Sequence, residues 1–563
     1  EQLGKVDLND DKWEPLEKNS SAFVKLSKIH VKGESNAWGR ASATIDASAE
    51  KVVAWFWDYC SNERIATVRN FEKNPRELIK SVSDNHNIFS TVKTMPWPSR
   101  TRQFVFENTW MKREDGSFVY AFRPPQTDAY DDITHLDLAK KSRRMVIRGE
   151  LWGFVTIKPD GASSCTITYV KLIDLKGHTP PKIMDLQIPI GLKHVFQLRD
   201  KFNRDDEIDK IEQERLMAIM RNSDKEVYSL SEEQLIDSVQ KMKNITEDLF
   251  QPLKSPDFRT KMSLAHIDGE NCGIMRCETT IDTYVEDCAA YNFLIMSRKR
   301  MRDNEGSATV YRQAANINNH ALHYNLIIDL GFGLNYRRFL SHQVWKRTED
   351  GGMIIVFRDI SESDLFRNIA SENKNRHIVT AHTSGYYWMM PEKNGCTKLI
   401  VLMQVDLGGI IPAFVADSRA VDFLSDYGRM RTDHNRDREI DERSRSLIIS
   451  KIDDDSIVLT EEEQNDIQRA RDQFKVFNNS EGSKFTLNTG DEFLSAVGGK
   501  AGGKIWCKMS TTIRCSGVEA LAFVMDITSR SLLSEHDVMD GNEVLKDEGH
   551  TRVVKVVEED SSR

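Results

Sequence analysis

The residues of this chain that could perform chemistry do not form a familiar catalytic pattern. The sequence has no GxSxG, HExxH, GxxxxGK[ST] or GxGxxG motif, and Gly331-Phe332-Gly333 alone is typical of a hairpin turn. His194 lies on a predicted helix and His135 in a polar segment, each without a spaced partner. Asp174 and Asp406 each precede a turn with Gly and Pro, which favours an Asx turn over an acid catalyst. We therefore predict no catalytic residue, no metal site, no cofactor and no enzyme activity.

Aromatic side chains, in contrast, gather on one face of two predicted strands. The strands run over 103–111 and 117–122, and Glu114-Asp115-Gly116 between them predicts a hairpin. Alternate residues of a strand point to the same side. The residues that share this side are Phe104, Phe106, Trp110, Phe118, Tyr120 and Phe122. This face could line a tunnel for a hydrophobic molecule or fill a solid core.

Two charged residues share a side with two aromatic residues in the next predicted strand, 144–157. Arg148 and Glu150 have the same parity as Trp152 and Phe154. If that side faces inward, two charges enter an apolar space, which is costly unless they are paired or hydrogen-bonded. Recognition of a ligand headgroup would then be their function. The alternative is that this side of the strand faces outward.

Composition and charge exclude several classes of protein. The 563 residues are 39% hydrophobic and 29% charged, which indicates a multidomain globular chain and excludes collagen-like and low-complexity classes. A net charge of −9 gives no electrostatic reason to expect a nucleic-acid partner. The eight cysteines contain no CxxC, which favours reduced thiols in the cytoplasm. No run approaches the ~20 apolar residues of a membrane-spanning helix, and the first residue is Glu1, which suggests a fragment.

A short basic run, Arg298-Lys299-Arg300-Met301-Arg302, stands out from this acidic background. Such a run could meet an anionic membrane surface, or it could be a solvated helix end. Transient contact with a membrane surface, and a location peripheral to a membrane, are therefore kept beside the cytoplasmic expectation.

The chain repeats itself. Residues 174–209 align without a gap on residues 406–441, and Glu207-Ile208-Asp209 is repeated as Glu439-Ile440-Asp441. Other aligned identities are Arg102/Arg337, Phe104/Phe339, Trp110/Trp345, Arg199/Arg431 and Asp205/Asp437. Thr44-Ile45 recurs as Thr280-Ile281 and again as Thr512-Ile513. The sequence therefore holds two full copies of one unit and the beginning of a third.

Each unit is predicted to be α+β. It opens with a short strand over 40–45 and a helix whose N-cap is Asp46 or Ser48. Strands over 103–111, 117–122, 144–157 and 165–173 follow, separated by hairpin turns. A helix over 189–202, with Leu192, Val195 and Phe196 on its apolar side, closes the unit. Helices segregated onto one face of an antiparallel sheet are the expected architecture.

The strand that ends in Ile173-Asp174, with a Gly, a Pro and an amphipathic helix after it, resembles the START (StAR-related lipid transfer) domain. Pro96-Trp97-Pro98-Ser99-Arg100 before an aromatic strand adds to the resemblance. It implies a helix-grip fold, in which a curved antiparallel sheet wraps a long C-terminal helix and encloses a tunnel for one lipid. The second copy has Asp329-Leu330-Gly331-Phe332-Gly333 where the first has the Pro-Trp-Pro segment, so we expect it to bind less.

The expected organisation is a tandem array. START-like units are predicted at 35–204 and 268–436, with an incomplete third unit at 504–563. Charged helical spacers are predicted at 205–262 and 437–495, where Ser231-Glu232-Glu233-Gln234 and Thr460-Glu461-Glu462-Glu463 have the pattern of capping boxes. The tunnel residues implied for the first unit are Phe104, Phe106, Trp110, Tyr120, Phe122, Arg148, Glu150, Trp152, Phe154, Leu192 and Phe196.

Three functions remain open on the sequence alone. The first is the binding, or also the transfer, of a lipid or other hydrophobic molecule without covalent chemistry. The second is a scaffolding array that has lost the tunnel and binds protein partners through its repeats. The third is an enzyme of the wider helix-grip superfold, because a fold does not determine a function.

Overall fold

The computed structural model describes most of the chain. The residues outside the description are 1–11, 17–18, 32–35, 66–75, 94–99, 127–145, 178–180, 244, 268–271, 306, 332–333, 362–376, 410–416, 418, 455, 457, 480–484, 488–493, 502–503, 527–528, 531–541, 549–550 and 557–563. Three features singled out in the sequence fall there: the Pro-Trp-Pro segment, His135 and Phe332-Gly333.

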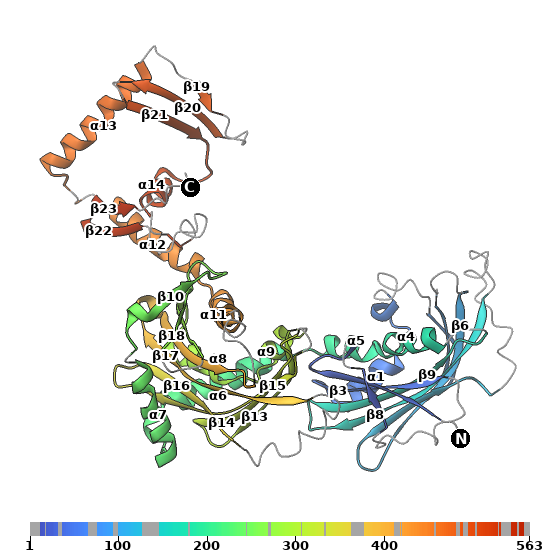
Figure 1. Cartoon of the computed structure of the whole chain (residues 1–563). Coiled ribbons are helices and arrows are strands. Elements are labelled where there is room, and N and C mark those ends of the chain that lie inside the picture. The colour runs from blue at the N-terminus through green and yellow to red at the C-terminus, as the bar shows by residue number, and fades with distance from the viewer. Residues whose placement is uncertain are drawn as a thin grey trace. The chain divides into compact units, whose positions relative to one another are not determined.

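The first copy forms a nine-stranded sheet with helices on one face (Figure 1). The strands are β1 (Glu14–Pro15), β2 (Val24–His30), β3 (Ala37–Ile45), β4 (Arg76–Ser83), β5 (His86–Lys93), β6 (Arg102–Lys112), β7 (Phe118–Arg123), β8 (Ile147–Pro159) and β9 (Cys165–Asp174). Their order is β1-β2-β3-β9-β8-β7-β6-β5-β4, antiparallel except for a short parallel pairing of β6 with β8. The sheet thus begins before residue 35, where the predicted unit started.

The first helix, α1 (Ala49–Trp57), follows β3 directly. Ser48 is its N-cap, because the Ser48 side chain accepts a hydrogen bond from the Lys51 N–H. Val52, Val53 and Phe56 are buried against the sheet. Of the two N-cap candidates in the sequence, Ser48 therefore caps the helix, and Asp46 is left for another role.

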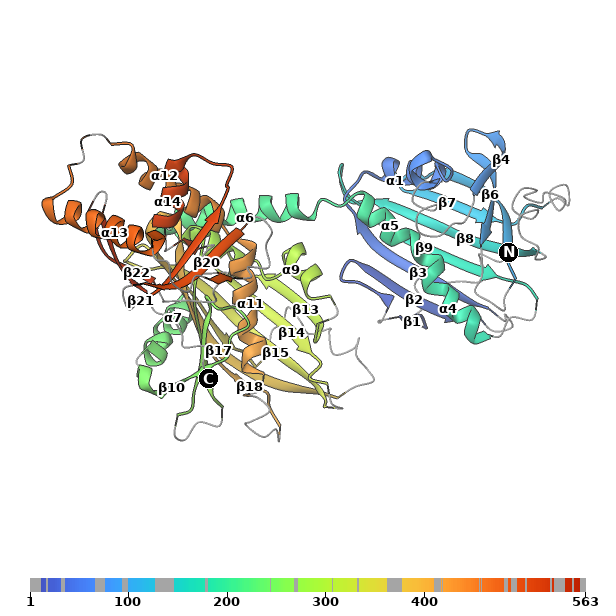
Figure 2. The same ribbon diagram turned by 90° about the horizontal axis from the view of Figure 1, so that it is seen from above.

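The closing helix is longer than predicted and is interrupted. It consists of α4 (Pro181–Leu192) and α5 (His194–Lys201), with Lys193 between them. The predicted start at Pro189 is wrong: proline suits a helix N-terminus, but here Pro189 lies inside α4. In both views α1, α4 and α5 lie on the same face of the first sheet (Figure 2).

The second copy has the same strand order. Its strands are β10 (Phe250–Leu253), β11 (Lys261–Ala265), β12 (Ile274–Ile281), β13 (Thr309–Asn316), β14 (Ala321–Ile328), β15 (Tyr336–Arg347), β16 (Met353–Asp359), β17 (Ile378–Pro391) and β18 (Thr397–Asp406). Trp110 pairs with Tyr120 in the first sheet, and Trp345 pairs with the aligned Ile355 in the second. Its helices are α8 (Val285–Phe293), α9 (Arg298–Asp303) and α11 (Ala420–Asp433). The structure thus confirms the duplication and the tandem α+β fold.

The turns after β9 and β18 are duplicated in detail. Asp174 Oδ1 accepts from the Lys176 N–H at 2.8 Å, and Asp406 Oδ1 accepts from the Gly408 N–H at 2.8 Å. These are the Asx turns that the sequence predicted. Lys176 has a φ of 50° where the second copy has Gly408 at 66°, so the first copy holds a non-glycine residue in the left-handed region.

Helices dominate the predicted spacers, but each spacer also contains a strand. The helices are α6 (Asp205–Arg221), α7 (Leu230–Lys243), α12 (Asp437–Ile452) and α13 (Glu461–Asn479). β10 falls in the first spacer, and β19 (Phe485–Leu487) in the second. The capping box of α13 is confirmed, since Thr460 and Glu463 bond each other's backbone N–H. α7 instead uses Ser229 with Glu232, two residues before the predicted position.

The beginning of the third copy includes β20 (Leu494–Ala501), β21 (Lys504–Thr511), α14 (Gly517–Met525), β22 (Asn542–Glu548) and β23 (Thr551–Val556). The chain divides into two compact units that do not follow the copies strictly. Unit 1 comprises residues 1–215 and 294–312, and unit 2 comprises 216–293 and 313–563. The segment 294–312, which includes α9, comes from the second copy and is part of unit 1.

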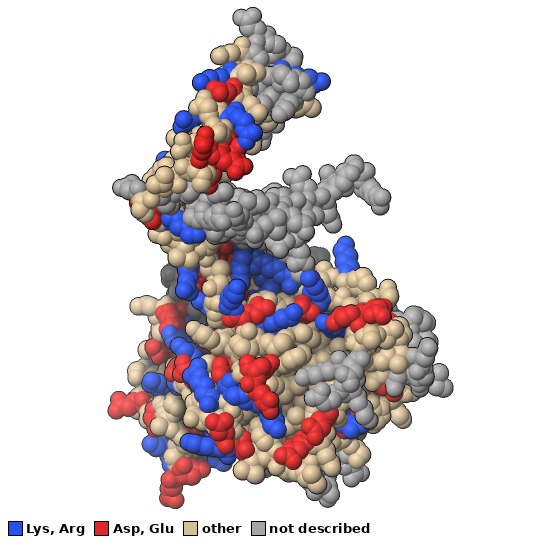
Figure 3. Space-filling view, turned by 90° about the vertical axis from the view of Figure 1, so that its left-hand side faces the viewer, with Lys and Arg blue, Asp and Glu red and all other residues tan. Residues whose placement is uncertain are grey.

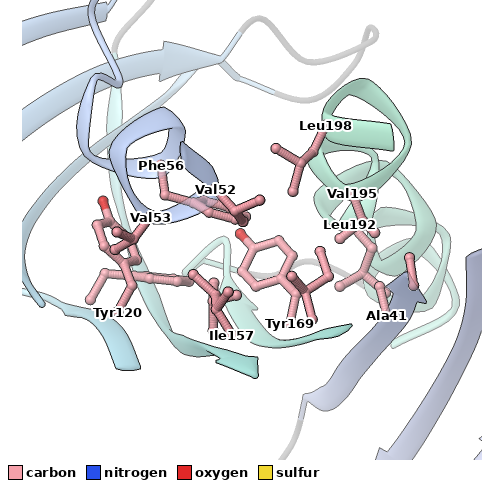
Figure 4. Packing of buried hydrophobic residues seen from close by; sticks show 14 of the residues in the cluster. Ala41, Val52, Val53, Phe56, Tyr120, Ile157, Tyr169, Leu192, Val195 and Leu198 are labelled. Carbon is pink, nitrogen blue, oxygen red and sulfur yellow. The ribbon is translucent and has the colours of Figure 1, made fainter. Parts of the chain in front are cut away.

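The main core of unit 1 lies between its helices and the sheet (Figure 4). Figure 4 shows Val52, Val53 and Phe56 of α1 and Val195 and Leu198 of α5 directed toward the sheet. Strand residues from β3 to β9 complete the same cluster. Removal of this apolar area from water is the main stabilising contribution to the unit.

We expect Leu198→Ala to lower the free energy of unfolding by about 2–5 kcal/mol, because Leu198 is fully buried and the substitution leaves a cavity. Phe196→Ala should lower the free energy of unfolding by less, because Phe196 is only partly buried. Urea titration of the intact chain with hydrogen exchange read in α5 measures both values. Asp200→Ala on the exposed side of α5 is the control, and a loss below about 1 kcal/mol for Leu198→Ala would contradict the packing.

Candidate functional site

The candidate ligand site is the inner face of the first sheet. Phe104, Phe106, Tyr120 and Phe122 are 2–6% exposed and belong to the central cluster of unit 1. Leu192 is buried in the same cluster, and Trp110 and Phe196 pack against it. Seven of the eleven predicted tunnel residues therefore converge from β6, β7, α4 and α5.

The remaining four predicted residues lie on the other face of the sheet. In β8 the odd-numbered residues from Leu151 to Ile157 are buried inward, and Arg148, Glu150, Trp152 and Phe154 alternate with them. Trp152 and Phe154 pack in a separate cluster with Trp13, Trp38 and Val170. Glu150 forms an ion pair with Lys176 Nζ at 2.9 Å. This side of β8 therefore faces outward, which is the alternative that the sequence left open.

Aromatic rings fill the inner face closely. The ring centroids of Phe106 and Phe122 are 6.3 Å apart, and those of Phe122 and Tyr169 are 6.0 Å apart, within the range of favourable aromatic pairs. Phe122 also lies over Gly153, where a Cβ would sit 2.4 Å from its ring. The aligned pair Phe357 and Gly385 repeats this approach in the second copy. Glycine thus permits the close packing of ring on strand in both copies.

Few polar groups interrupt this apolar face. Tyr120 donates a hydrogen bond from its hydroxyl to Asn108 Oδ1 at 2.8 Å. Burial raises the pKa of Tyr120 well above its usual value, so its hydroxyl remains protonated. Buried polar atoms with a partner cost little and orient the rings.

A small cavity of about 10 Å³ lies between α4 and strands β3 and β9, and its lining includes Asn36, Lys171 and Ile173. The second copy has a cavity of about 10 Å³ at the matching place, lined by Gly273, Val405 and Phe423. Each has room for one water molecule. Neither of these two cavities has room for a ligand of lipid size.

A second candidate site is a buried cluster of charges in unit 1. Arg199 forms an ion pair with Asp205 and lies 3.6 Å from Asp46 Oδ2, and all three side chains are at most 7% exposed. Two carboxylates and one guanidinium leave a net negative charge. Arg298 of α9 neutralises it, with Nη1 at 2.5 Å from Asp46 and 3.2 Å from Asp205. Asp209 caps α9 by accepting the Arg298 N–H at 2.8 Å. We call these five residues the charged joint.

The charged joint is repeated in unit 2. Arg530, aligned with Arg298, forms an ion pair with Asp282 and has Nη1 at 3.4 Å from Asp437. Its backbone N–H donates to Asp441 at 2.7 Å. These aspartates align with Asp46, Asp205 and Asp209. The identities Asp205/Asp437 and Asp209/Asp441 were visible in the sequence, but nothing there showed that they share one arginine partner.

Ion pairs within unit 1 explain part of the basic run 298–302. Arg298 and Arg302 face carboxylates of unit 1, and Lys299 pairs with Asp303 at 2.8 Å. On the face shown in Figure 3, basic and acidic side chains are interspersed. Within the described residues no helix has the length and apolar composition needed to cross a membrane, and none of the eight cysteines, all of which are described, forms a disulfide.

Similarity to known proteins is found among solved structures. No protein-family model matches the chain, and no curated protein matches it. Solved structures are similar to it. Human STARD10 is 15% identical and covers 37% of this chain and 80% of its own, with a TM-score of 0.29. A STAR-related lipid transfer protein from Xanthomonas axonopodis is 20% identical and covers 34% of this chain and 100% of its own, with a TM-score of 0.28.

A third similar structure has two domains. The di-domain ARO/CYC protein BexL from the BE-7585A biosynthetic pathway is 9% identical and covers 71% of this chain and 98% of its own, with a TM-score of 0.20. The two single-domain structures each cover about a third of the chain. At these identities the likeness is one of fold.

We expect Arg298→Met to destabilise unit 1 by about 3–5 kcal/mol, because it leaves the buried Asp46 and Asp205 with too little positive charge. Thermal unfolding of the intact chain, with hydrogen exchange read in α9, measures the effect. Lys299→Met, which breaks the exposed pair with Asp303, is the matched control. Equal protection of α9 in both variants would contradict the charged joint.

Acid should weaken the same cluster. Burial alone would raise the pKa of Asp205, but hydrogen bonds and charge from Arg199 and Arg298 outweigh it and hold the pKa below its usual value. The resulting stability is complete above the pKa of an unfolded aspartate, about 4, and is lost as pH falls through the folded pKa. Melting temperatures between neutral pH and pH ~3 should therefore fall less steeply in Asp205→Asn than in the wild type. Parallel curves would contradict this role for Asp205.

Proposed function

We propose that the first START-like unit binds a hydrophobic molecule, such as a lipid, between its helices and the inner face of its sheet, without covalent chemistry. The convergence of Phe104, Phe106, Tyr120 and Phe122 beneath α1 and α5 supports this proposal. Burial of a ligand's apolar surface against such a face contributes about 25 cal/mol per Å². Few polar groups are needed to orient a ligand of this kind.

Entry of the ligand depends on the closing helix. Leu192, Val195 and Leu198 of this helix are fully buried on the inner face, so a ligand must displace them from the rings. The interruption at Lys193 separates α4 from α5, which lets one segment move while the other stays packed. Helix ends of this kind are typical hinge positions. A membrane surface would be the source of such a ligand, through transient contact.

A structural role for the array is the second candidate, and the repeated charged joint supports it. Arg298 in unit 1 and Arg530 in unit 2 occupy equivalent places among three aspartates. A chain that repeats both its folds and the charge cluster that follows each fold has the features of a scaffold, to which protein partners could bind. This role does not require an interior that opens.

We expect Val155→Trp to abolish uptake of a fluorescent lipid by the intact protein. Val155 is fully buried in β8 and pairs with Tyr120 and Tyr169 on the neighbouring strands, so a larger side chain occupies the space that a ligand needs. Thr156→Trp, on the opposite face of the same strand, is the matched control and should retain uptake. Circular dichroism and thermal unfolding verify that both variants fold.

Native mass spectrometry of the wild-type protein completes this test. Co-purified lipid that is lost only in Val155→Trp supports the carrier function. Uptake that is equal in a folded Val155→Trp and the wild type would contradict it. A folded wild-type protein that neither carries nor takes up lipid of any class would also reject the carrier function and leave the structural one.

A further inference from the structure

Two arginines meet at the edge of the inner face in unit 1. Arg64, which follows α1, is 6% exposed, and its guanidinium carbon lies 3.8 Å from the ring centre of Trp55. Arg76 begins β4, and its guanidinium carbon lies 4.3 Å from the ring centre of Tyr59. Arg64 lies 5.1 Å from the same Tyr59 ring. Both guanidinium groups therefore lie close to the ring of Tyr59.

Neither arginine has a carboxylate partner in the described part of the chain. Arg64 donates from Nη1 to the Trp55 carbonyl at 2.6 Å. Arg76 donates from Nη1 to the Tyr59 carbonyl at 3.5 Å, and its Nη2 lies 3.4 Å from His194 Nε2. Asp58 and Glu77, whose charges raise the pKa of Cys60, are both exposed. Buried guanidinium groups are ordinarily neutralised.

The surroundings add further positive charge. Burial, together with the charges of Lys171, Arg76, Arg64 and Lys93, holds the pKa of His194 well below its usual value, so the imidazole is neutral at pH 7. Burial, with the charge of Arg76, lowers the pKa of Arg64 to about 10. Both shifts have the direction expected for cations that lack an anion. The site has the electrostatic character of an anion site.

Apolar rings continue from this point into the inner face. The ring centroid of Tyr59 lies 5.5 Å from that of Phe89 and 5.6 Å from that of Phe106. Tyr59 also contacts His194, at 6.4 Å between ring centroids. A charged head and an apolar tail would therefore both find complementary groups within a few ångströms of Tyr59.

We propose that Arg64 and Arg76 bind the anionic group, a carboxylate or a phosphate, of a hydrophobic ligand whose chain lies against Phe89 and Phe106. The inference rests on the proposed function of the first unit and specifies its ligand class. Arginine suits this role because its planar donors match the two oxygens of a carboxylate or phosphate.

The second copy differs at this site in its sequence. Arg64 and Arg76 align with Arg300 and Arg312, but Tyr59 aligns with Ile295 and His194 with Asp426. Asp426 forms an ion pair with Arg429. A carboxylate at the position of the imidazole is unfavourable for an anion. We therefore assign the anion site to the first copy.

The test compares three ligands that share one apolar chain: palmitate, hexadecyl phosphate and hexadecanol. Their affinities for the intact protein are measured by displacement of a fluorescent lipid. The wild type should bind the two anions at least about tenfold more tightly than the alcohol, since a hydrogen bond to a charged group contributes ~1.5–3 kcal/mol. Arg76→Gln should remove that preference and leave hexadecanol unchanged. Arg76→Lys should restore part of it.

Two controls keep the result specific. Arg113→Gln removes an exposed arginine from the same unit and should change none of the affinities. Arg64→Met is the second variant of the site, with its fold verified by thermal unfolding because Arg64 stacks on Trp55. Inorganic phosphate that displaces palmitate from the wild type but not from Arg76→Gln would support the anion site and identify a free ion as a source.

The outcomes separate the two proposals. Equal wild-type affinities for all three ligands, or an equal loss for all three in a folded Arg76→Gln, would overturn the anion site while the carrier function stands. Binding of none of the three ligands would overturn both. A preference for only one of the two anions, lost in Arg76→Gln, supports the site and identifies carboxylate or phosphate as its ligand group.

Discussion

The need to neutralise buried charge determines how unit 1 is assembled. Asp205 begins α6, Asp46 follows β3 and Arg199 lies in α5, so three distant parts of the chain bring charge to one buried place. One guanidinium cannot satisfy two carboxylates, and an uncompensated buried charge costs several kcal/mol. Arg298 completes the balance, which explains why the segment 294–312 is part of unit 1 although its sequence belongs to the second copy.

The aspartates of the repeated cluster in unit 2 are again paired with arginines, although some of the partners differ. In unit 2, Arg431 pairs with Asp257 at 2.7 Å, whereas the aligned Arg199 pairs with Asp205. Arg259, which lies outside the aligned set, takes Asp437 at 2.5 Å instead. The cluster therefore remains neutral through an additional Arg–Asp pair. Paired carboxylates of this kind have lowered pKa values in both units, as Asp205 and Asp437 do, because the arginines outweigh the effect of burial.

Sequence patterns predicted β3, β6, β7, β8 and β9 of the first sheet but not β1, β2, β4 and β5, and they did not predict which face is inside. Strict alternation placed Phe104 and Phe106 on a common side of their strand, and Trp152 and Phe154 on a common side of theirs. Both faces of this sheet, however, bear apolar residues. The outer face of β8 is covered by Trp13 and Trp38, and in unit 2 the matching face is covered by Leu235 and Val239 of α7. When both faces of a sheet are apolar, the alternation of residues along a strand is the same whichever face is inside. The cluster around Tyr59 was missed because Arg64 and Arg76 are neighbours of His194 only in the folded chain.

The two charge clusters of unit 1 differ in how their charges are balanced within the described residues. In the charged joint, Asp46 and Asp205 are paired with Arg199 and Arg298, so these four charges need no partner from outside the chain. Among the described residues, the contacts of Arg64 and Arg76 are with aromatic rings, carbonyls and an imidazole, none of which carries a negative charge. Cation–π contacts offset part of the cost of burial, but they leave the charge in place. A folded unit that keeps such a site gains most from a ligand with an anion at one end and an apolar chain at the other, since each part removes a separate cost.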